Sequence, residues 1–386
     1  MSTRLMPTTA LALFAATLAG CHETTGPDEP FPSGLVTLEW HAKARDLIAT
    51  NRLNALATGR VLAALAVAQQ RAIVQVDGPN PPAGPLDRDR FEARRGAVAG
   101  ASVQVLSSFF PDEAMAFEQL QTEQGNAETG QTHPQFAHGV AIGRAAGDAM
   151  IDHVQNDGFT APWTGSVPVG SGLWVAATLP PGGAMLGGVK PYFLSSGSQF
   201  RPSLPPAYGS AAFATDLEEV VTLTKNITPA ELEFARHWDF PLGSYTPIGF
   251  WNEAAATYIE EDGLDERAAS GVFALTHAAV FDALIGCWEA KYHYWILRPS
   301  HADATISMAF PLPNFPSYPS GHSCASSAAA RVLTSFFPAR SNQLATWVDE
   351  AGLSRILAGI HYRFDITAGE ELGIKVAEWA IARGTP

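Results

Sequence analysis

The sequence predicts an all-α protein. Apolar residues recur at every third or fourth position over long stretches in both halves of the chain, and strictly alternating stretches rich in β-branched residues are few. A helix start signal agrees with this pattern. Thr228, Pro229 and Glu231 combine an N-cap residue, a proline at the first helical position and an early acidic residue.

The first residues predict an export signal. Arg4 is followed by an apolar run, and the stretch Leu18-Ala19-Gly20-Cys21 resembles a bacterial lipobox. The alternative is a short buried helix with a chance cysteine. We expect a lipoprotein signal peptide over 1–20, lipidation at Cys21 and a tether over 21–40. The protein would then be exported and held on the bacterial cell envelope by this anchor, facing the periplasm or the exterior.

The N-terminal half is predicted to form a helical domain over 41–210. Helical spacing of apolar residues covers 41–76, 88–110, 112–124 and 136–152. Between 158 and 209 the composition shifts to proline, glycine and aromatic residues. A disordered linker is the alternative for this segment, but its aromatic residues favour ordered irregular structure packed on the bundle.

Helical spacing resumes in the C-terminal half. It covers 211–226, 229–239, 251–261, 265–288, the segment after His322, and 342–357. No stretch after the N-terminal signal reaches the roughly 18 uninterrupted apolar residues of a membrane span, so membrane contact is expected only through the lipid anchor. The formal net charge of −14 over 386 residues argues against a nucleic-acid partner.

The residues with a chemical role are concentrated in three short fragments. They are Lys291 with Arg298-Pro299, then Pro319 to His322, and then Ser354-Arg355 with His361 and Asp365. Lys291, Arg298 and Arg355 supply three cations. Convergent cations of this kind suit a tetrahedral oxyanion such as phosphate or vanadate, whose charge is spread over several oxygens.

The second fragment precedes a predicted helix. Ser320 offers a hydroxyl and Gly321 an accessible backbone N–H, and a helix N-terminus favours an anion. Two histidines remain for chemistry. One imidazole, of His361 or His322, can bond the central atom while the other moves protons.

Asp365 follows His361 by four residues. If this segment is helical, the two side chains share a face and the carboxylate can orient the imidazole. Gly359 can equally end a helix before that point. Taken alone, His361 would be an ordinary interior histidine and Asp365 an ordinary surface carboxylate. That interpretation requires all three fragments to coincide by chance.

In order and spacing, the three fragments resemble the signature of the type 2 phosphatidic acid phosphatase and vanadium-dependent haloperoxidase superfamily, in particular its secreted bacterial members similar to vanadium chloroperoxidase. The resemblance implies two helical bundles with the irregular segment between them, the catalytic one spanning 211–386. It also implies a bound vanadate, with phosphate able to occupy the same site. The implied oxyanion ligands are Lys291, Arg298, Ser320, Gly321, Arg355 and His361.

The resemblance implies two chemistries. In a haloperoxidase, His361 binds vanadate, Lys291 polarises bound hydrogen peroxide, His322 handles protons, and halide is oxidised to hypohalous acid that reaches a small organic acceptor. In a soluble acid phosphatase, His361 attacks a phosphate ester to form a phosphohistidine and His322 protonates the leaving oxygen. A third possibility, a non-catalytic lipoprotein that binds vanadate or phosphate, has no need of both histidines.

Further features favour the haloperoxidase. Trp288 and Phe315 match the positions where the superfamily has the aromatic residues of a halide pocket, although both could be core residues. Asp239 matches an acidic residue that braces an active-site arginine. The roughly two hundred residues before the catalytic bundle exceed what a minimal phosphatase needs.

The remaining cysteines and histidines receive no catalytic role. Cys287 and Cys324 flank site fragments, and both a disulfide and two buried thiols remain open. A zinc pair at His133 and His138 is not expected, because Pro134 breaks regular structure between them. We expect His277 and His293, which flank the site region, either to have structural roles or to support the residues that contact the oxyanion.

Overall fold

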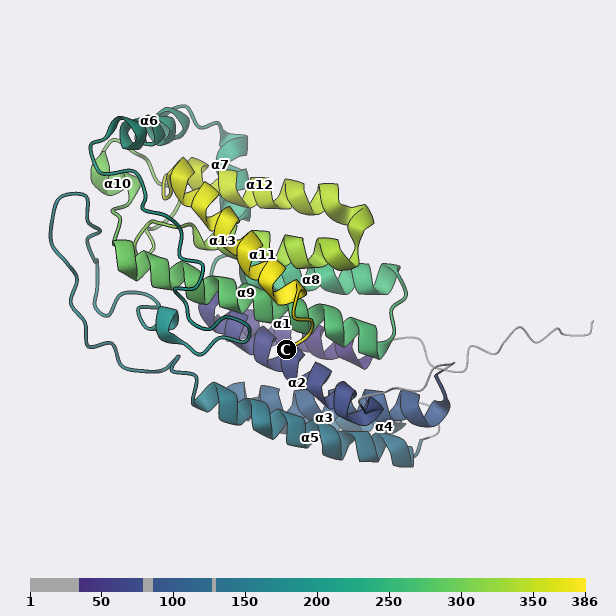
Figure 1. Ribbon diagram of the computed structural model, residues 1–386. Coiled ribbons are helices and arrows are strands. Elements are labelled where there is room, and N and C mark those ends of the chain that lie inside the picture. The colour runs from purple at the N-terminus through teal and green to yellow at the C-terminus, as the bar shows by residue number, and fades with distance from the viewer. Residues whose placement is uncertain (1–34, 79–85, 127–129) are drawn as a thin grey trace, which may run out of the picture. The chain divides into compact units, whose positions relative to one another are not determined.

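The computed structural model describes residues 35–78, 86–126 and 130–386, so the predicted signal peptide and Cys21 lie outside the described residues. The described residues form thirteen α-helices, which confirms the all-α prediction (Figure 1). The helices are α1 (Val36–Thr50), α2 (Ala55–Asp77), α3 (Arg88–Phe109), α4 (Ala114–Asn126), α5 (Pro134–Gln155), α6 (Ala211–Lys225), α7 (Pro229–His237), α8 (Thr246–Glu261), α9 (Glu266–Tyr294), α10 (Pro299–Ala302), α11 (Gly321–Phe336), α12 (Ser341–Leu357) and α13 (Arg363–Ile381).

Helix α9 is the central element and presents the first site residue. Its 29 residues begin after Asp265, whose side chain accepts a hydrogen bond from the Ala268 amide, and end at Tyr294. Trp295, which follows, has the left-handed conformation. It packs against α2 on one side and against α11 and α13 on the other. By length and composition α9 could cross a membrane, but 94% of its apolar window is buried inside the protein. Its composition is therefore that of a core helix.

Helices α3 and α5 form a tight pair in the N-terminal half. A Cβ atom on Gly96 of α3 would lie 2.0 Å from the Phe136 carbonyl oxygen, and one on Gly139 of α5 would lie 2.0 Å from the Ala93 carbonyl oxygen. Only glycine allows this approach of the two backbones. Helix α2 lies between this pair and α9, so the apolar core is continuous from the first helices to the site.

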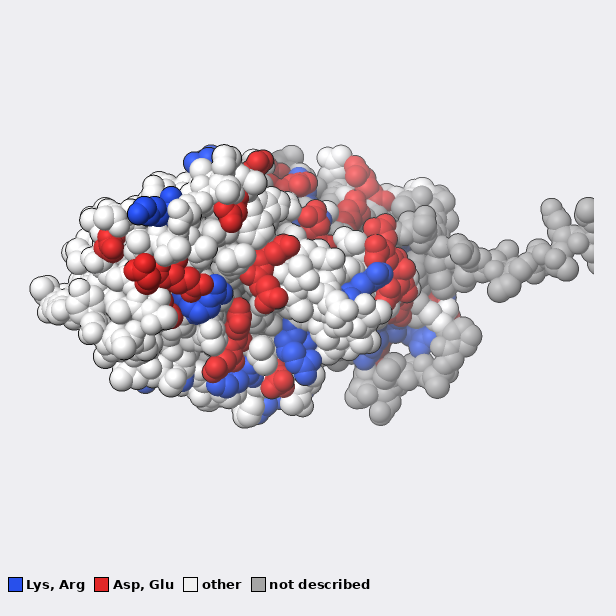
Figure 2. Space-filling view, turned by 90° about the horizontal axis from the view of Figure 1, so that it is seen from above, with Lys and Arg blue, Asp and Glu red and all other residues white. Residues whose placement is uncertain are grey.

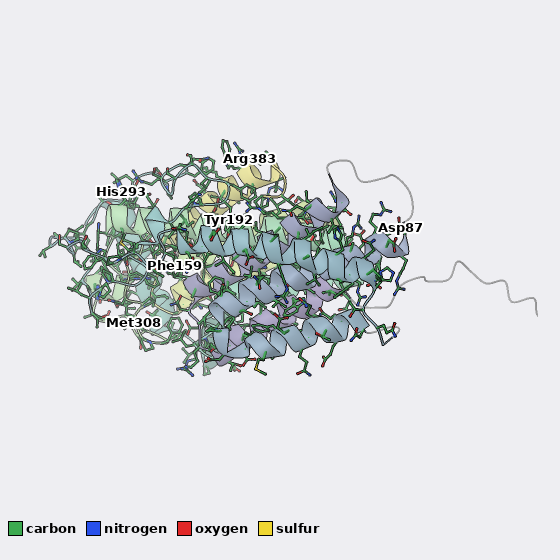
Figure 3. The ribbon with its side chains drawn as sticks, turned by 90° about the horizontal axis from the view of Figure 1, so that it is seen from below. Asp87, Phe159, Tyr192, His293, Met308 and Arg383 are labelled. Atoms are coloured by element: carbon green, nitrogen blue, oxygen red, sulfur yellow. The ribbon has the colours of Figure 1, made fainter. Side chains whose placement is uncertain are left out.

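The segment 158–209 is ordered and irregular, as predicted, with one short 3-10 helix at Leu186–Gly188. Asp282 of α9 anchors it by accepting hydrogen bonds from the amides of Tyr192, Phe193 and Leu194, at 2.8, 2.7 and 3.0 Å. Phe159, at the start of the segment, packs its ring under the Arg60 guanidinium, whose carbon lies 4.5 Å from the ring centroid (Phe159 and Tyr192 are labelled in Figure 3). The segment is thereby fixed on α9.

Two expectations about element bounds were wrong. The first helical stretch begins at Val36 rather than 41, because buried Glu266 accepts hydrogen bonds from the Val36 and Thr37 amides and so caps this end. The same stretch is also broken after Thr50, and Asn54 caps the second helix by accepting from the Leu56 and Ala57 amides.

Helix α13 was not predicted. Gly369 and Gly373 lower its intrinsic helix propensity and interrupt its apolar pattern. A Cβ atom on Gly373 would lie 2.4 Å from the Cys324 carbonyl oxygen of α11, so these glycines permit close packing of the two helices. The capping box at Thr228 and Glu231, in contrast, is present as predicted.

Candidate active site

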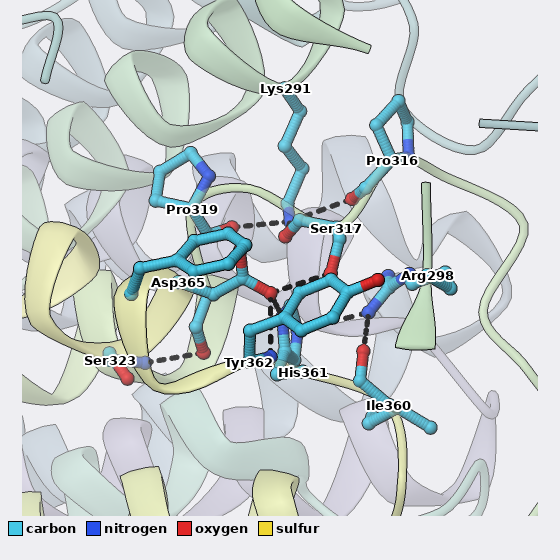
Figure 4. Close-up of polar contacts among 12 residues, drawn as sticks. Lys291, Arg298, Pro316, Ser317, Pro319, Ser323, Ile360, His361, Tyr362 and Asp365 are labelled. Carbon is cyan, nitrogen blue, oxygen red and sulfur yellow. Dashed lines mark hydrogen bonds and ion pairs between the residues drawn. The ribbon is translucent and has the colours of Figure 1, made fainter. Parts of the chain in front are cut away.

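The three sequence fragments converge at one place in the C-terminal half (Figure 4). Lys291 comes from the last turn of α9, Arg298 precedes α10, the Pro319 to His322 fragment begins α11, and Arg355 lies in the last turn of α12. His361 lies in the turn between α12 and α13. The three cations are at most 1% exposed, whereas Figure 2 shows basic residues in several separate places among acidic ones on one outer face.

Arg298 is held by backbone carbonyls and faces His361. Its Nε donates to the Phe315 oxygen at 3.1 Å, and its Nη1 donates to the Ile360 oxygen at 2.7 Å and to His361 Nε2 at 3.1 Å. Its Nη2 is buried and has no hydrogen-bond partner. Burial lowers the pKa of Arg298 to about 10, so the guanidinium is charged at neutral pH. A buried charged donor without an acceptor is what an anion would satisfy.

His361 is oriented by Asp365. Its Nδ1 donates to Asp365 Oδ2 at 2.7 Å, which leaves Nε2 as the acceptor facing Arg298. The pKa of His361 lies well below its ordinary value because of burial and then the charges of Arg298 and Lys291. In a neutral imidazole the Nε2 lone pair, which here accepts from Arg298, can instead bond an electrophilic central atom.

The contact between His361 and Asp365 does not come from two residues on one helical face. Helix α12 ends at Leu357, Gly359 follows with a φ of 74°, and α13 begins only at Arg363. Asp365 is the third residue of α13, and its carboxylate also accepts from the Tyr362 amide at 3.1 Å. The carboxylate therefore caps α13 and orients His361 at the same time.

Lys291 is buried and bonded to the chain before Ser320. Its Nζ donates to the carbonyl oxygens of Pro316 at 3.0 Å, Ser317 at 2.8 Å and Pro319. Burial lowers its pKa to about 8. All three ammonium N–H groups thus have carbonyl acceptors, and Lys291 contributes positive potential while holding this turn in place.

The turn at Ser320 places a helix N-terminus in the site. Ser320 caps α11 with its side chain, which accepts from the Ser323 amide, while its own amide donates to the Asp365 carbonyl oxygen at 2.9 Å. Gly321 and His322 are the first two residues of α11, so their amides have no acceptor within the helix. These two N–H groups add to the positive potential near Arg298.

Helix α7 and the two residues after it fix the second histidine and the third cation. His322 Nε2 donates to the Trp238 carbonyl oxygen at 2.9 Å, which leaves Nδ1 to exchange protons. Burial and then the charge of Arg355 lower the pKa of His322 well below its ordinary value. Arg355 donates through Nη1 to Asp239 at 3.4 Å and through Nη2 to the Ala235 oxygen at 2.9 Å. Asp239 therefore lies beside a site arginine, Arg355, as the resemblance implied.

Trp288 and Phe315 form an aromatic pair beside the helix N-terminus. Their ring centroids are 5.1 Å apart, and Lys291 Nζ lies 5.5 and 5.2 Å from the two rings. A Cβ atom on Gly321 would lie 3.1 Å from the Trp288 ring, so the indole contacts the backbone of the site itself. Both rings are part of the site's wall as well as of the core.

Cys287 and Cys324 are free buried thiols beside the site, so the disulfide left open by the sequence is not present. His277 lies away from the three fragments, where its Nε2 contacts the Asn252 side chain at 2.7 Å. His133 caps α5. Among the described residues no group of three or more histidine, cysteine or acidic side chains is arranged to hold a metal ion directly.

Two groups that contribute to the site, the Trp238 carbonyl and Ser317, were not predicted from the sequence. The Trp238 carbonyl is a backbone group and leaves no signal in the side-chain pattern. Ser317 donates its hydroxyl to Asp365 Oδ2 at 2.5 Å, but in the sequence it stands among prolines outside the three fragments.

Part of the chain is similar in sequence to known proteins. Residues 269–383 match the PAP2 superfamily. Over 89 residues the chain is 35% identical to the non-specific acid phosphatase of Salmonella typhi and 34% identical to that of Salmonella typhimurium, in each case 22% of this chain and 36% of the phosphatase. The chain thus covers about a third of the length of these relatives.

Solved structures share the fold over nearly the whole chain. A bacterial vanadium-dependent iodoperoxidase superposes with a TM-score of 0.76 at 22% identity, covering 91% of this chain and 97% of the iodoperoxidase. The apo form of a bacterial vanadium-dependent chloroperoxidase superposes with a TM-score of 0.68 at 16% identity, covering 86% of this chain and 93% of that one. The resemblance to the superfamily is therefore confirmed over residues 269–383, and the chain shares its fold with solved vanadium-dependent haloperoxidases.

Proposed function

We propose that this chain, whose residues 269–383 match the PAP2 superfamily, is a vanadium-dependent haloperoxidase that oxidises halide with hydrogen peroxide to hypohalous acid. The observation on which this choice rests is the Trp288 and Phe315 pair, which stands against Gly321 and Lys291 at the edge of the oxyanion site. Aromatic ring edges carry partial positive charge and are suitable neighbours for a halide ion. The shared fold, which includes the N-terminal half, supports the same choice.

The residues present fit vanadate. The unpartnered Nη2 of Arg298 is a buried donor, the amides of Gly321 and His322 are free of helix acceptors, and His361 Nε2 offers a lone pair. Arg355 supplies a further cation. Vanadate held by these residues would supply an electrophilic metal centre that activates hydrogen peroxide toward halide.

The protein's own residues would divide the work as follows. Asp365 holds the His361 ring so that Nε2 faces the central atom. Lys291 and Arg298, both fully buried, would stabilise negative charge. His322, fixed by the Trp238 oxygen, takes up and returns protons through Nδ1.

Reconstitution with vanadate tests this function. Purified protein incubated with orthovanadate is expected to brominate a phenol-type dye in hydrogen peroxide and bromide, and to lose this activity when vanadate is removed. Metal analysis of the same samples measures the bound vanadium. An absence of vanadate-dependent turnover, together with phosphate release from a generic ester, would favour the phosphatase instead.

A soluble acid phosphatase is the second candidate, because the 89-residue match is to acid phosphatases. In that reaction His361 would attack phosphorus through Nε2 and His322 would protonate the leaving oxygen. Failure of both assays with retained oxyanion binding would favour the non-catalytic binding lipoprotein.

Substitution of the second histidine separates proton transfer from binding. In His322→Ala, turnover is expected to fall about 10²- to 10⁴-fold, the usual contribution of a general acid or base. The dissociation constant for inorganic phosphate is expected to change by less than about tenfold, because the cations remain. Isothermal titration calorimetry measures the second quantity, and complete loss of phosphate binding would contradict the assigned role.

We also propose that the mature protein is lipid-anchored at Cys21 on the cell envelope. The support is the lipobox-like stretch that ends at Cys21. Mass spectrometry of the protein isolated from membranes tests this, and a mature N-terminus other than a lipidated Cys21 would contradict it.

A further inference from the structure

Ser317 bonds to two parts of the site at once. Its hydroxyl donates to Asp365 Oδ2 at 2.5 Å, and its carbonyl oxygen accepts from Lys291 Nζ at 2.8 Å (Figure 4). Ser317, Lys291 and Asp365 are all fully buried. One residue outside the three sequence fragments therefore joins the first fragment to the third.

The orientation of the Asp365 carboxylate depends on this contact. Its Oδ2 accepts from the Ser317 hydroxyl, from His361 Nδ1 at 2.7 Å and from the Tyr362 amide at 3.1 Å, while its Oδ1 is buried without a partner. Two of these three donors belong to the segment that contains Asp365 itself. Ser317 is the one side-chain donor that comes from the turn before α11, so it fixes the carboxylate relative to that turn.

The turn before α11 and the start of α13 are joined a second time through the backbone. The Ser320 amide donates to the Asp365 carbonyl oxygen at 2.9 Å, and Lys291 holds the carbonyls on either side of Ser317. The turn is thus rigidly placed, and a hydroxyl mounted on it can set the position of a distant side chain.

We propose that Ser317 is a positioning residue for oxyanion binding, which aligns the His361 Nε2 atom by holding Asp365 against the turn that Lys291 anchors. The inference rests on the proposed function only in requiring that His361 bonds a bound oxyanion. It assigns a role to a residue that the three fragments do not include.

Removal of the hydroxyl tests the proposal. In Ser317→Ala, the dissociation constants for inorganic vanadate and inorganic phosphate are expected to rise about 10- to 100-fold, as for other groups that orient a metal or anion ligand. The ⁵¹V resonance of bound vanadate should also move, because the His361 ligand is no longer held in one orientation. Binding is measured without peroxide, halide or ester, so the result does not depend on which reaction the protein catalyses.

Ser102→Ala is the matched control. Ser102 is equally buried, lies on α3 away from the site, and donates its hydroxyl to the Val98 oxygen at 2.7 Å. Both variants should lose similar thermal stability, but Ser102→Ala should keep wild-type oxyanion affinity. Equal loss of affinity in the two variants would overturn the proposal, since the effect would then be general destabilisation.

A double-mutant cycle identifies the path of the effect. If Ser317 acts through Asp365, the change Ser317→Ala should alter phosphate affinity less than about threefold in an Asp365→Ala background. Phosphate is the probe because it remains monomeric at the high concentrations that weak binding requires. A full Ser317 effect in that background would overturn the proposal, as would wild-type affinity in Ser317→Ala alone. Failure of the wild-type protein to bind either anion would instead contradict the proposed function.

Discussion

Replacing His361 with alanine is expected to abolish turnover, whichever of the two chemistries operates. The imidazole of His361 faces the Arg298 guanidinium through Nε2 at 3.1 Å and is held by the Asp365 carboxylate through Nδ1 at 2.7 Å. The variant lacks this oriented nitrogen, which is the atom assigned to bond the central atom. We expect a decrease of at least about 10³-fold in kcat/KM, as for the loss of a nucleophile in other enzymes.

The measurement is vanadate-dependent bromination and ester hydrolysis with equal amounts of folded protein. His293→Ala is the matched control, because His293 is exposed in the last turn of the same helix as Lys291 and its ring packs on Tyr294. It should keep wild-type turnover. Turnover near wild type in His361→Ala would refute the role assigned to this histidine.

The second large effect is expected from Arg298. In Arg298→Ala, the affinity for phosphate and vanadate should fall about 100-fold or more, because a buried charge-assisted donor contributes about 1.5 to 3 kcal/mol. Arg298 has a buried Nη2 without a partner in addition to the Nη1 that faces His361. The carbonyls of Phe315 and Ile360 would also lose their donor, so a lower melting temperature is expected in the same variant.

Two further variants separate charge from geometry at this position. Arg298→Lys keeps the charge but loses the planar fork, so it should bind more weakly than wild type and more tightly than Arg298→Ala. Arg340→Ala removes an exposed arginine that pairs with Glu261 at 2.7 Å on the surface, and it should leave anion binding unchanged. Titration calorimetry with phosphate measures all three, and unchanged affinity in Arg298→Ala would contradict the oxyanion site.

Much of the helical architecture follows from local sequence. The capping box at Thr228 and the ordered irregular structure of 158–209 were both predicted from residues close together in the chain. The structure has both features. Helix α13 was not predicted, because Gly369 and Gly373 are unfavourable for a helix in isolation. They are suitable only because α11 packs against them, which is a tertiary fact.

The position at which the first helix starts was predicted wrongly for a related reason. Its capping acceptor is Glu266, which lies about 230 positions further along the chain, so the residues near 36 carry no local signal for a helix N-terminus. Local rules cannot find a cap that the fold brings from so far.

The kind of site could be predicted from the side chains alone. Three cations, a Ser-Gly-His turn and two histidines at fixed spacings predict an oxyanion site because charge and donor type are properties of individual side chains. How these groups are bonded to one another depends on the packing of the fold. It directs the Lys291 ammonium to three carbonyls, leaves one Arg298 nitrogen unpartnered, fixes His322 on the Trp238 oxygen and brings Ser317 to Asp365. Those arrangements depend on backbone atoms and on residues far apart in the chain, whose positions only the packed fold defines.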